Sequence, residues 1–96
     1  MLNFKFQNIK VEKGNIGANE VVVRGEVTNR SGRSYNTVAA RIVVFVKNMA
    51  ISNTVFAING LSAGSTKQFE KVIEDLAYSQ VGKDITSCEI TVDSAF

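Results

Sequence analysis

Apolar and polar residues alternate with a period of two along most of this chain. In residues 20–29, the apolar parity carries Val21, Val23, Gly25 and Val27, whereas the other parity is mixed. A period of two places one set of side chains on each face of a β-strand. This segment is therefore predicted to be a strand with one face in the core.

The longest alternating segment is "TVAARIVVFVKN", residues 37–48. One parity is apolar from Val38 to Val46, and the segment is rich in β-branched residues, which favours a strand over a helix. The opposite parity includes Val43 and Phe45, so both faces are partly apolar. Two explanations stay open: Tyr78 or the N-terminal segment covers this face, or a partner domain or second copy does.

The N-terminal segment "FKFQNIKVE", residues 4–12, changes parity along its length. Phe4 and Phe6 share one parity, and Ile9 and Val11 share the other. A shift of one residue is typical of a β-bulge, which we predict near Gln7 or Asn8.

Three further segments have the length and composition of strands, at residues 51–58, 65–73 and 86–94. Between the last two, a short helix near 74–82 is expected, with Leu76 and Val81 pointing inward and Glu74 and Asp75 at its solvated start. Strands punctuated by Gly, Asn and Ser, with scarcely any helix, predict an all-β fold. We expect an immunoglobulin-like antiparallel β-sandwich of six to seven strands that forms one domain over residues 1–96.

Two turn clusters are expected to form the corners of this sandwich. In "VTNRSGRSYNTV", Asn29 can accept from the backbone two residues on, and Gly32 can supply a positive φ. Arg30 and Arg33 then point to water, and a ligand-binding tip is the alternative. Leu61 and Gly64 form the second corner by packing and chain reversal. A single core is predicted from the apolar parities, built on Val23, Val27, Ile42, Val44 and Phe69.

The composition argues against several classes of partner, metal site and catalytic activity. The net charge is only +2, and the arginines lack the interleaved aromatics of a nucleic-acid stacking platform, so no nucleic acid is expected as partner. Apolar runs fall far short of the roughly 20 residues that span a bilayer, so no direct membrane insertion is expected. With no His and one Cys, neither a transition-metal site nor a cysteine–base pair is expected. We predict no cofactor and no enzymatic activity, and Cys88 is expected to be buried and unreactive.

Two stretches, "VVVRGEVTNRSGRSYNTVAARIVVF" and "INGLSAGSTKQFE", resemble the bacterial FxLYD family of immunoglobulin-like domains. The similarity lies in a G-x-V-x-N-x-S corner, a long apolar strand, and an L-x-x-G turn with a Phe five residues later. Where the family has its name-giving motif, this chain has "VVFVKN", with Phe45 in the aromatic position and no matching acid. The resemblance implies an extracytoplasmic accessory module of bacterial surface proteins or lipoproteins, without catalytic residues.

These observations predict a non-catalytic interaction or spacer module of a larger bacterial surface protein or lipoprotein. Its partner would be another protein or a neighbouring domain of the same chain. The alternative is a small cytoplasmic β-sandwich that forms a homo-oligomer, such as a weak homodimer, since no targeting segment is visible. The candidate interaction residues are Val43, Phe45, Arg30 and Arg33, and self-association is expected to use an edge strand or the Val43/Phe45 face.

Overall fold

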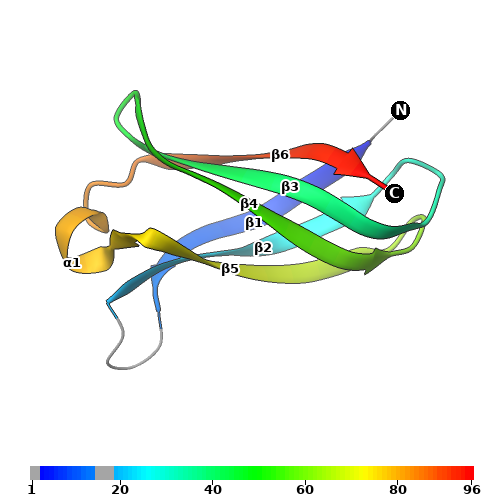
Figure 1. The fold of residues 1–96 in the computed structure, drawn as a ribbon, viewed down its shortest axis with the longest axis horizontal. Helices are drawn as coiled ribbons and strands as arrows, with labels where there is room; N and C mark the ends of the chain where they lie inside the picture. The colour runs from blue at the N-terminus through cyan, green and yellow to red at the C-terminus, as the bar shows by residue number, and fades with distance from the viewer. Residues whose placement is uncertain (1–2, 15–18) are drawn as a thin grey trace.

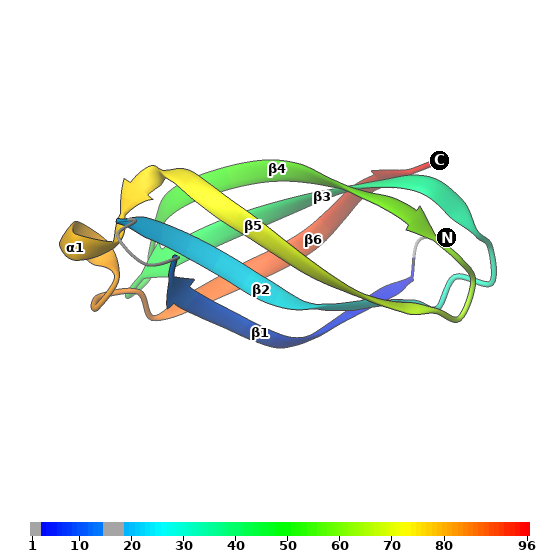
Figure 2. The same ribbon diagram turned by 90° about the horizontal axis from the view of Figure 1, so that it is seen from below.

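The computed structural model describes residues 3–14 and 19–96, which form six strands and one short helix (Figure 1). The elements are β1 (Phe4–Lys13), β2 (Glu20–Asn29), β3 (Tyr35–Val46), β4 (Met49–Leu61), β5 (Thr66–Ala77), α1 (Tyr78–Val81) and β6 (Ser87–Ala95). All strand pairs are antiparallel, in one sheet of order β1-β2-β5 and another of order β4-β3-β6. The two sheets form the layers seen in Figure 2. The predicted antiparallel β-sandwich is confirmed.

The central strands of the two sheets carry most of the buried apolar side chains of the core. In β2, Val21, Val23 and Val27 are fully buried, and in β3 the same holds for Val38, Ala40, Ile42 and Val44. These are the parities that the sequence assigned to the core. A strand with neighbours on both sides and a second sheet beneath it has its inner face shielded from water, so burial of these apolar side chains drives the packing of the layers.

The core consists of two clusters, which corrects the prediction of a single one. Val23, Ile42 and Val44 belong to one cluster, and Val27 belongs to the other. Phe69 packs against both, together with Phe56, and the two rings lie 5.5 Å apart. Between Val23 and Val27, Gly25 contributes no side chain to the inner face of β2, and Ile9 and Phe69 reach towards it.

The predicted bulge in β1 is confirmed. The register of β1 against β2 shifts between Gln7 and Lys10, and Asn8 has a φ of 55°. The Asn8 Nδ2 donates to Glu26 Oε1 at 2.7 Å, and Gln7 Nε2 donates to the same oxygen at 3.2 Å. Asparagine tolerates the left-handed conformation better than most residues, so it suits this position.

The region around residues 74–82 differs in part from expectation. The short helix exists, but it spans only Tyr78–Val81, because β5 continues through Ala77. Glu74 and Asp75 therefore lie in a strand, and their placement at a helix start was wrong. The register against β2 jumps from Ile73 to Ala77, which leaves residues 74–76 as an irregularity. Leu76 and Val81 contact the core, as predicted.

Candidate functional site

The first corner is organised by Asn29, which is fully buried. Its Nδ2 donates to the carbonyl oxygens of Arg33 at 2.6 Å and of Leu61 at 3.0 Å. Its Oδ1 accepts from the backbone N–H of Ser31 at 3.0 Å, the bond predicted from the sequence. Gly32 has a φ of 82°, also as predicted. Asn29 thus joins the β2–β3 corner to the turn after β4.

Arg30 and Arg33 lie on this corner with exposed side chains, as expected. A hydrogen bond also fixes the backbone of this corner, because the backbone N–H of Arg30 donates to the carbonyl oxygen of Asn3 at 2.8 Å. Leu61, with only 1% of its surface exposed, and Gly64, with a φ of 77°, form the second corner beside them. The packing and hydrogen bonds of this corner stabilise the fold. Arg30 and Arg33 remain candidate interaction residues only because their side chains are exposed.

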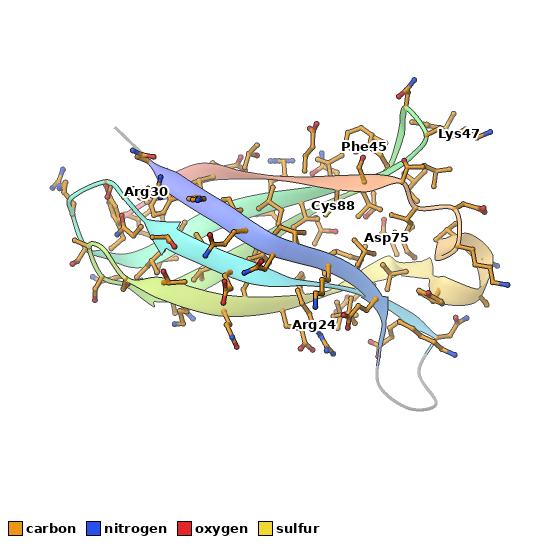
Figure 3. The ribbon with its side chains drawn as sticks, turned by 180° about the vertical axis from the view of Figure 1, so that it is seen from behind. Arg24, Arg30, Phe45, Lys47, Asp75 and Cys88 are labelled. Atoms are coloured by element: carbon orange, nitrogen blue, oxygen red, sulfur yellow. The ribbon has the colours of Figure 1, made fainter. Side chains whose placement is uncertain are left out.

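Val43 and Phe45 lie on the outer face of the β4-β3-β6 sheet, because Val44 between them points into the core. Both are half-buried. Tyr78 packs against the core and β1 belongs to the other sheet, so neither covers this face. Figure 3 shows Phe45 far from Arg30, towards the opposite end of the sandwich. The structure therefore does not bring the predicted interaction residues into one site.

A polar network crosses the middle of the same face. Arg41 donates from Nη2 and Nε to Asp93 Oδ2 at 3.0 and 3.2 Å, and from Nη1 to Asn53 Oδ1 at 2.8 Å. These contacts connect β3 with both neighbouring strands. Val55, whose partner across the ladder is Arg41, is 52% exposed. This face therefore has apolar side chains both beside Arg41, at Val55, and at the hairpin end of β3, at Phe45.

The β3–β4 hairpin end is apolar on its inner side as well. Val46, Met49, Ile51 and Val81 line an open hollow of about 670 Å³, together with the polar Lys47, Asn48 and Asp84. Met49 is 69% exposed. The sequence pattern did not indicate this hollow, because the hollow depends on the helix approaching the hairpin. The available signal was Met49 directly after the turn, where a polar residue is more usual.

A second hollow, of about 520 Å³, lies on the outer face of the β1-β2-β5 sheet and is charged. Arg24 lines it, with Nη1 3.3 Å from Glu12 Oε2 and Nε 3.1 Å from Glu70 Oε2. The Nε–H does not point at the Glu70 carboxylate, so this second contact is ionic without being a hydrogen bond. Glu12 and Glu70 pair with Arg24, and Glu26 accepts from Gln7 and Asn8, so Lys10 is the one charged residue lining this hollow that has no ion pair or hydrogen bond within the described residues.

Cys88 is half-buried, which is less than the sequence predicted. It lines an open hollow between β1 and β6 with Ile9, Val11 and Ile85. Burial raises the pKa of its thiol, because the thiolate is poorly solvated there. The nucleophilic form is therefore disfavoured near neutral pH.

Neither metal-binding clusters nor membrane-spanning helices occur in the described part of the chain. Within residues 3–14 and 19–96, no three His, Cys, Asp or Glu side chains are grouped so that they could hold a metal ion. No helix in those ranges has the length and apolar character needed to cross a bilayer.

Comparison of the chain with protein-family models, with curated proteins and with solved structures finds no match in any of the three.

Proposed function

We propose that this domain is a non-catalytic interaction module that binds a protein partner, or a neighbouring domain of its own chain, through the β3–β4 hairpin end. The observation that carries the proposal is that this end is apolar on both sides. Phe45 lies on the outer side, and Val46 and Ile51 line the hollow on the inner side. Met49 pairs with Val46, lines the same hollow and has 69% of its surface exposed.

An exposed methionine beside an apolar hollow favours protein contact. The thioether side chain is flexible and adapts to irregular surfaces, and burying it removes apolar area from water. Loops and turns held by a rigid sheet frequently carry binding. Lys47 and Asp84 lie in the same hollow and offer one charge of each sign to orient a partner.

The cellular setting of this module rests on the resemblance to FxLYD domains. Under that interpretation the domain is extracytoplasmic, in a bacterial surface protein or lipoprotein. The residues that carry the resemblance include the Asn29 corner and Gly64, and both form turns in this structure. The second candidate is a small cytoplasmic homo-oligomer, which the free edge strands of the two sheets favour.

A site-specific photo-crosslinker tests the hairpin end. The crosslinking residue is placed at Met49 or Phe45, and in matched variants at Arg30 or Arg33, in cells that naturally produce the protein. We expect the same partner band from Met49 and Phe45 and none from the corner positions. Crosslinks from Arg30 and Arg33 alone would refute the hairpin end as the binding site.

A second measurement uses the partner so identified. Met49→Lys should weaken its binding at least about tenfold, because the charge must be desolvated in an apolar contact. Arg30→Ala serves as the control and should leave binding unchanged. Protease accessibility of the protein on intact cells decides between the surface and cytoplasmic settings.

A further inference from the structure

The two long sides of the sandwich differ in how well they close the core. On the β4/β5 side, Ser52 Oγ donates to Asp75 Oδ1 at 2.8 Å, and Lys67 Nζ donates to the carbonyl oxygen of Asn59. The inward residues Ile58 and Ile73 are buried there. Polar contacts between the two edge strands thus seal this side.

The opposite side, between β1 and β6, stays open. Its inward side chains are all half-buried, and we call them the lateral seam: Phe4, Phe6, Ile9 and Val11 from β1, and Cys88, Ile90 and Val92 from β6. Two open hollows, of about 230 and 360 Å³, lie between the strands. Among the described residues, every buried apolar side chain comes from β2, β3, β4 or β5.

The seam is bordered by two free strand edges. β1 is at the edge of one sheet and β6 is at the edge of the other. An unpaired edge presents backbone N–H and C=O groups that invite another strand. In seven-stranded immunoglobulin sandwiches a three-stranded sheet packs on a four-stranded sheet, whereas each of the two sheets here has three strands. This side therefore has both apolar surface and hydrogen-bonding capacity to offer.

The two edges carry opposite charge. β1 has exposed Lys5, Lys10 and Lys13, none of which forms an ion pair within the described residues. β6 has Glu89 and Asp93 exposed, and Asp93 is held by Arg41. A basic edge and an acidic edge are complementary to each other, and each repels a copy of itself.

The strands run in opposite directions along the seam. One hollow is lined by Phe4 and Phe6 with residues 90–92, and the other by Ile9 and Val11 with residues 85–88. Residue numbers therefore rise along β1 as they fall along β6, and Figures 1 and 2 show the same antiparallel course.

We propose that the lateral seam is a self-association surface whose occupant is a second copy of this chain, with β1 of each copy beside β6 of the other. A two-fold axis parallel to the strands produces this arrangement. Such an axis keeps strand direction, so β1 and the other copy's β6 meet antiparallel, and the two seams cover each other.

Charge selects this axis over its alternative. A two-fold axis perpendicular to the sheets would put β1 against β1, and the lysines would face lysines. With the parallel axis, Lys5 and Lys10 of one copy lie on either side of Glu89 along β6 of the second copy, because Phe4 and Phe6 lie beside residues 90–92 and Ile9 and Val11 beside residues 85–88. The bulge at Asn8 interrupts the edge of β1, so main-chain pairing is confined to the extended stretches on either side of it.

This inference goes beyond the proposed function and is independent of it. The hairpin end lies outside the seam, so a dimer leaves Phe45 and Met49 free for a partner. A protein that binds through the hairpin end as a monomer would refute only the seam, and a dimer without hairpin-end crosslinks would refute only the proposed function.

Sedimentation velocity over a range of concentrations tests the seam. We expect a concentration-dependent dimer that weakens at higher salt. Lys5→Glu with Lys10→Glu, or Glu89→Lys alone, should lower the association constant about tenfold or more, because each places like charges together twice in the dimer. Arg30→Glu with Arg33→Glu changes the net charge by the same amount as the lysine pair and should have no effect.

The triple variant Lys5→Glu, Lys10→Glu, Glu89→Lys provides the decisive comparison. It exchanges the charges of the two edges within one chain, so β1 beside β6 should associate again. If β1 instead met β1, the triple variant would associate no better than the variant with the two lysines reversed. Circular dichroism of each variant shows that it is folded before association is compared.

Cys88 supplies a second readout within the seam. Its labelling by a thiol reagent should slow as the protein concentration rises in the wild type and the triple variant, but not in the two charge-reversed variants. A wild type that remains monomeric at its highest soluble concentration would overturn the proposal. So would a dimer that is insensitive to Lys5, Lys10 and Glu89, or a triple variant that does not recover.

Discussion

Ile9 occupies the space that a side chain on Gly25 would need. A Cβ built on Gly25 would lie 2.3 Å from Ile9 Cδ1 and 3.0 Å from Phe69 Cζ. Ile9 reaches this position because the bulge at Asn8 shifts β1 by one residue, so that Ile9 faces inward. The bulge and the glycine in the facing strand are thus two halves of one packing arrangement.

Gly25→Ala should therefore destabilise the fold by about 1–3 kcal/mol, because the added methyl overpacks the core. Urea unfolding measures the loss. In the background of Ile9→Ala the same substitution should cost less, since the alanine at position 9 frees the space. Equal costs in both backgrounds would show that Ile9 is not the obstacle.

Asn29→Ala should cost about 2–4 kcal/mol, because the carbonyl oxygens of Arg33 and Leu61 lose a buried donor. Thermal unfolding followed by circular dichroism gives the change in stability. Arg30→Ala, on the adjacent exposed position, is the matched control and should stay within about 0.5 kcal/mol of wild type. A similar loss in both variants would point to the corner as a whole and not to the Asn29 side chain.

Ile42→Ala should cost about 2–4 kcal/mol, since Ile42 is fully buried in the core cluster that also contains Val23 and Val44. Val38→Ala, in the other cluster, should lower the stability additively with Ile42→Ala, to within about 0.5 kcal/mol. Phe69→Ala should couple to both, because Phe69 packs against each cluster. Double-mutant cycles in urea measure the coupling. Strong coupling between Ile42 and Val38 would show that the two clusters act as a single core.

Cys88 should react slowly in the native state and gain reactivity only at alkaline pH. Burial raises the pKa of its thiol above the ordinary 9.0, so the native thiolate forms later than the unfolded one as pH rises. Alkylation rates against pH, with and without denaturant, should show the native curve displaced to higher pH. Coincident curves would contradict the burial of this side chain.

The same shift makes a small contribution to stability. Below 9.0 the thiol is neutral in both states and the contribution is complete. As pH rises from there through the raised native pKa, the unfolded thiol ionises first, which favours unfolding. Cys88→Ser should therefore lose less stability than the wild type as the pH rises into the alkaline range. An unchanged pH dependence of the unfolding free energy in that variant would contradict a contribution from Cys88.

Local patterns determined much of this fold. The alternation in residues 20–29 and 37–48 identified β2, β3 and their inner faces, because a period of two is a property of the backbone itself. The parity change after Phe6 located the bulge, and the turn chemistry of Asn29, Gly32 and Gly64 located both corners. These features depend on neighbours within a few residues, so the sequence alone was sufficient for them.

The tertiary structure decided what depends on distant segments. Pairing of Ile73 and Ala77 with β2 extended β5 past Glu74 and Asp75, which have no β2 partner themselves and where the local sequence favoured a helix. The approach of α1 to the hairpin created the hollow beside Met49. The strand order placed β1 at the edge of one sheet and β6 at the edge of the other, on the same open side of the sandwich. Alternation says which residues face inward, but not which strands become neighbours. That choice is made by contacts across the whole chain, and it determines which apolar side chains remain open to a partner.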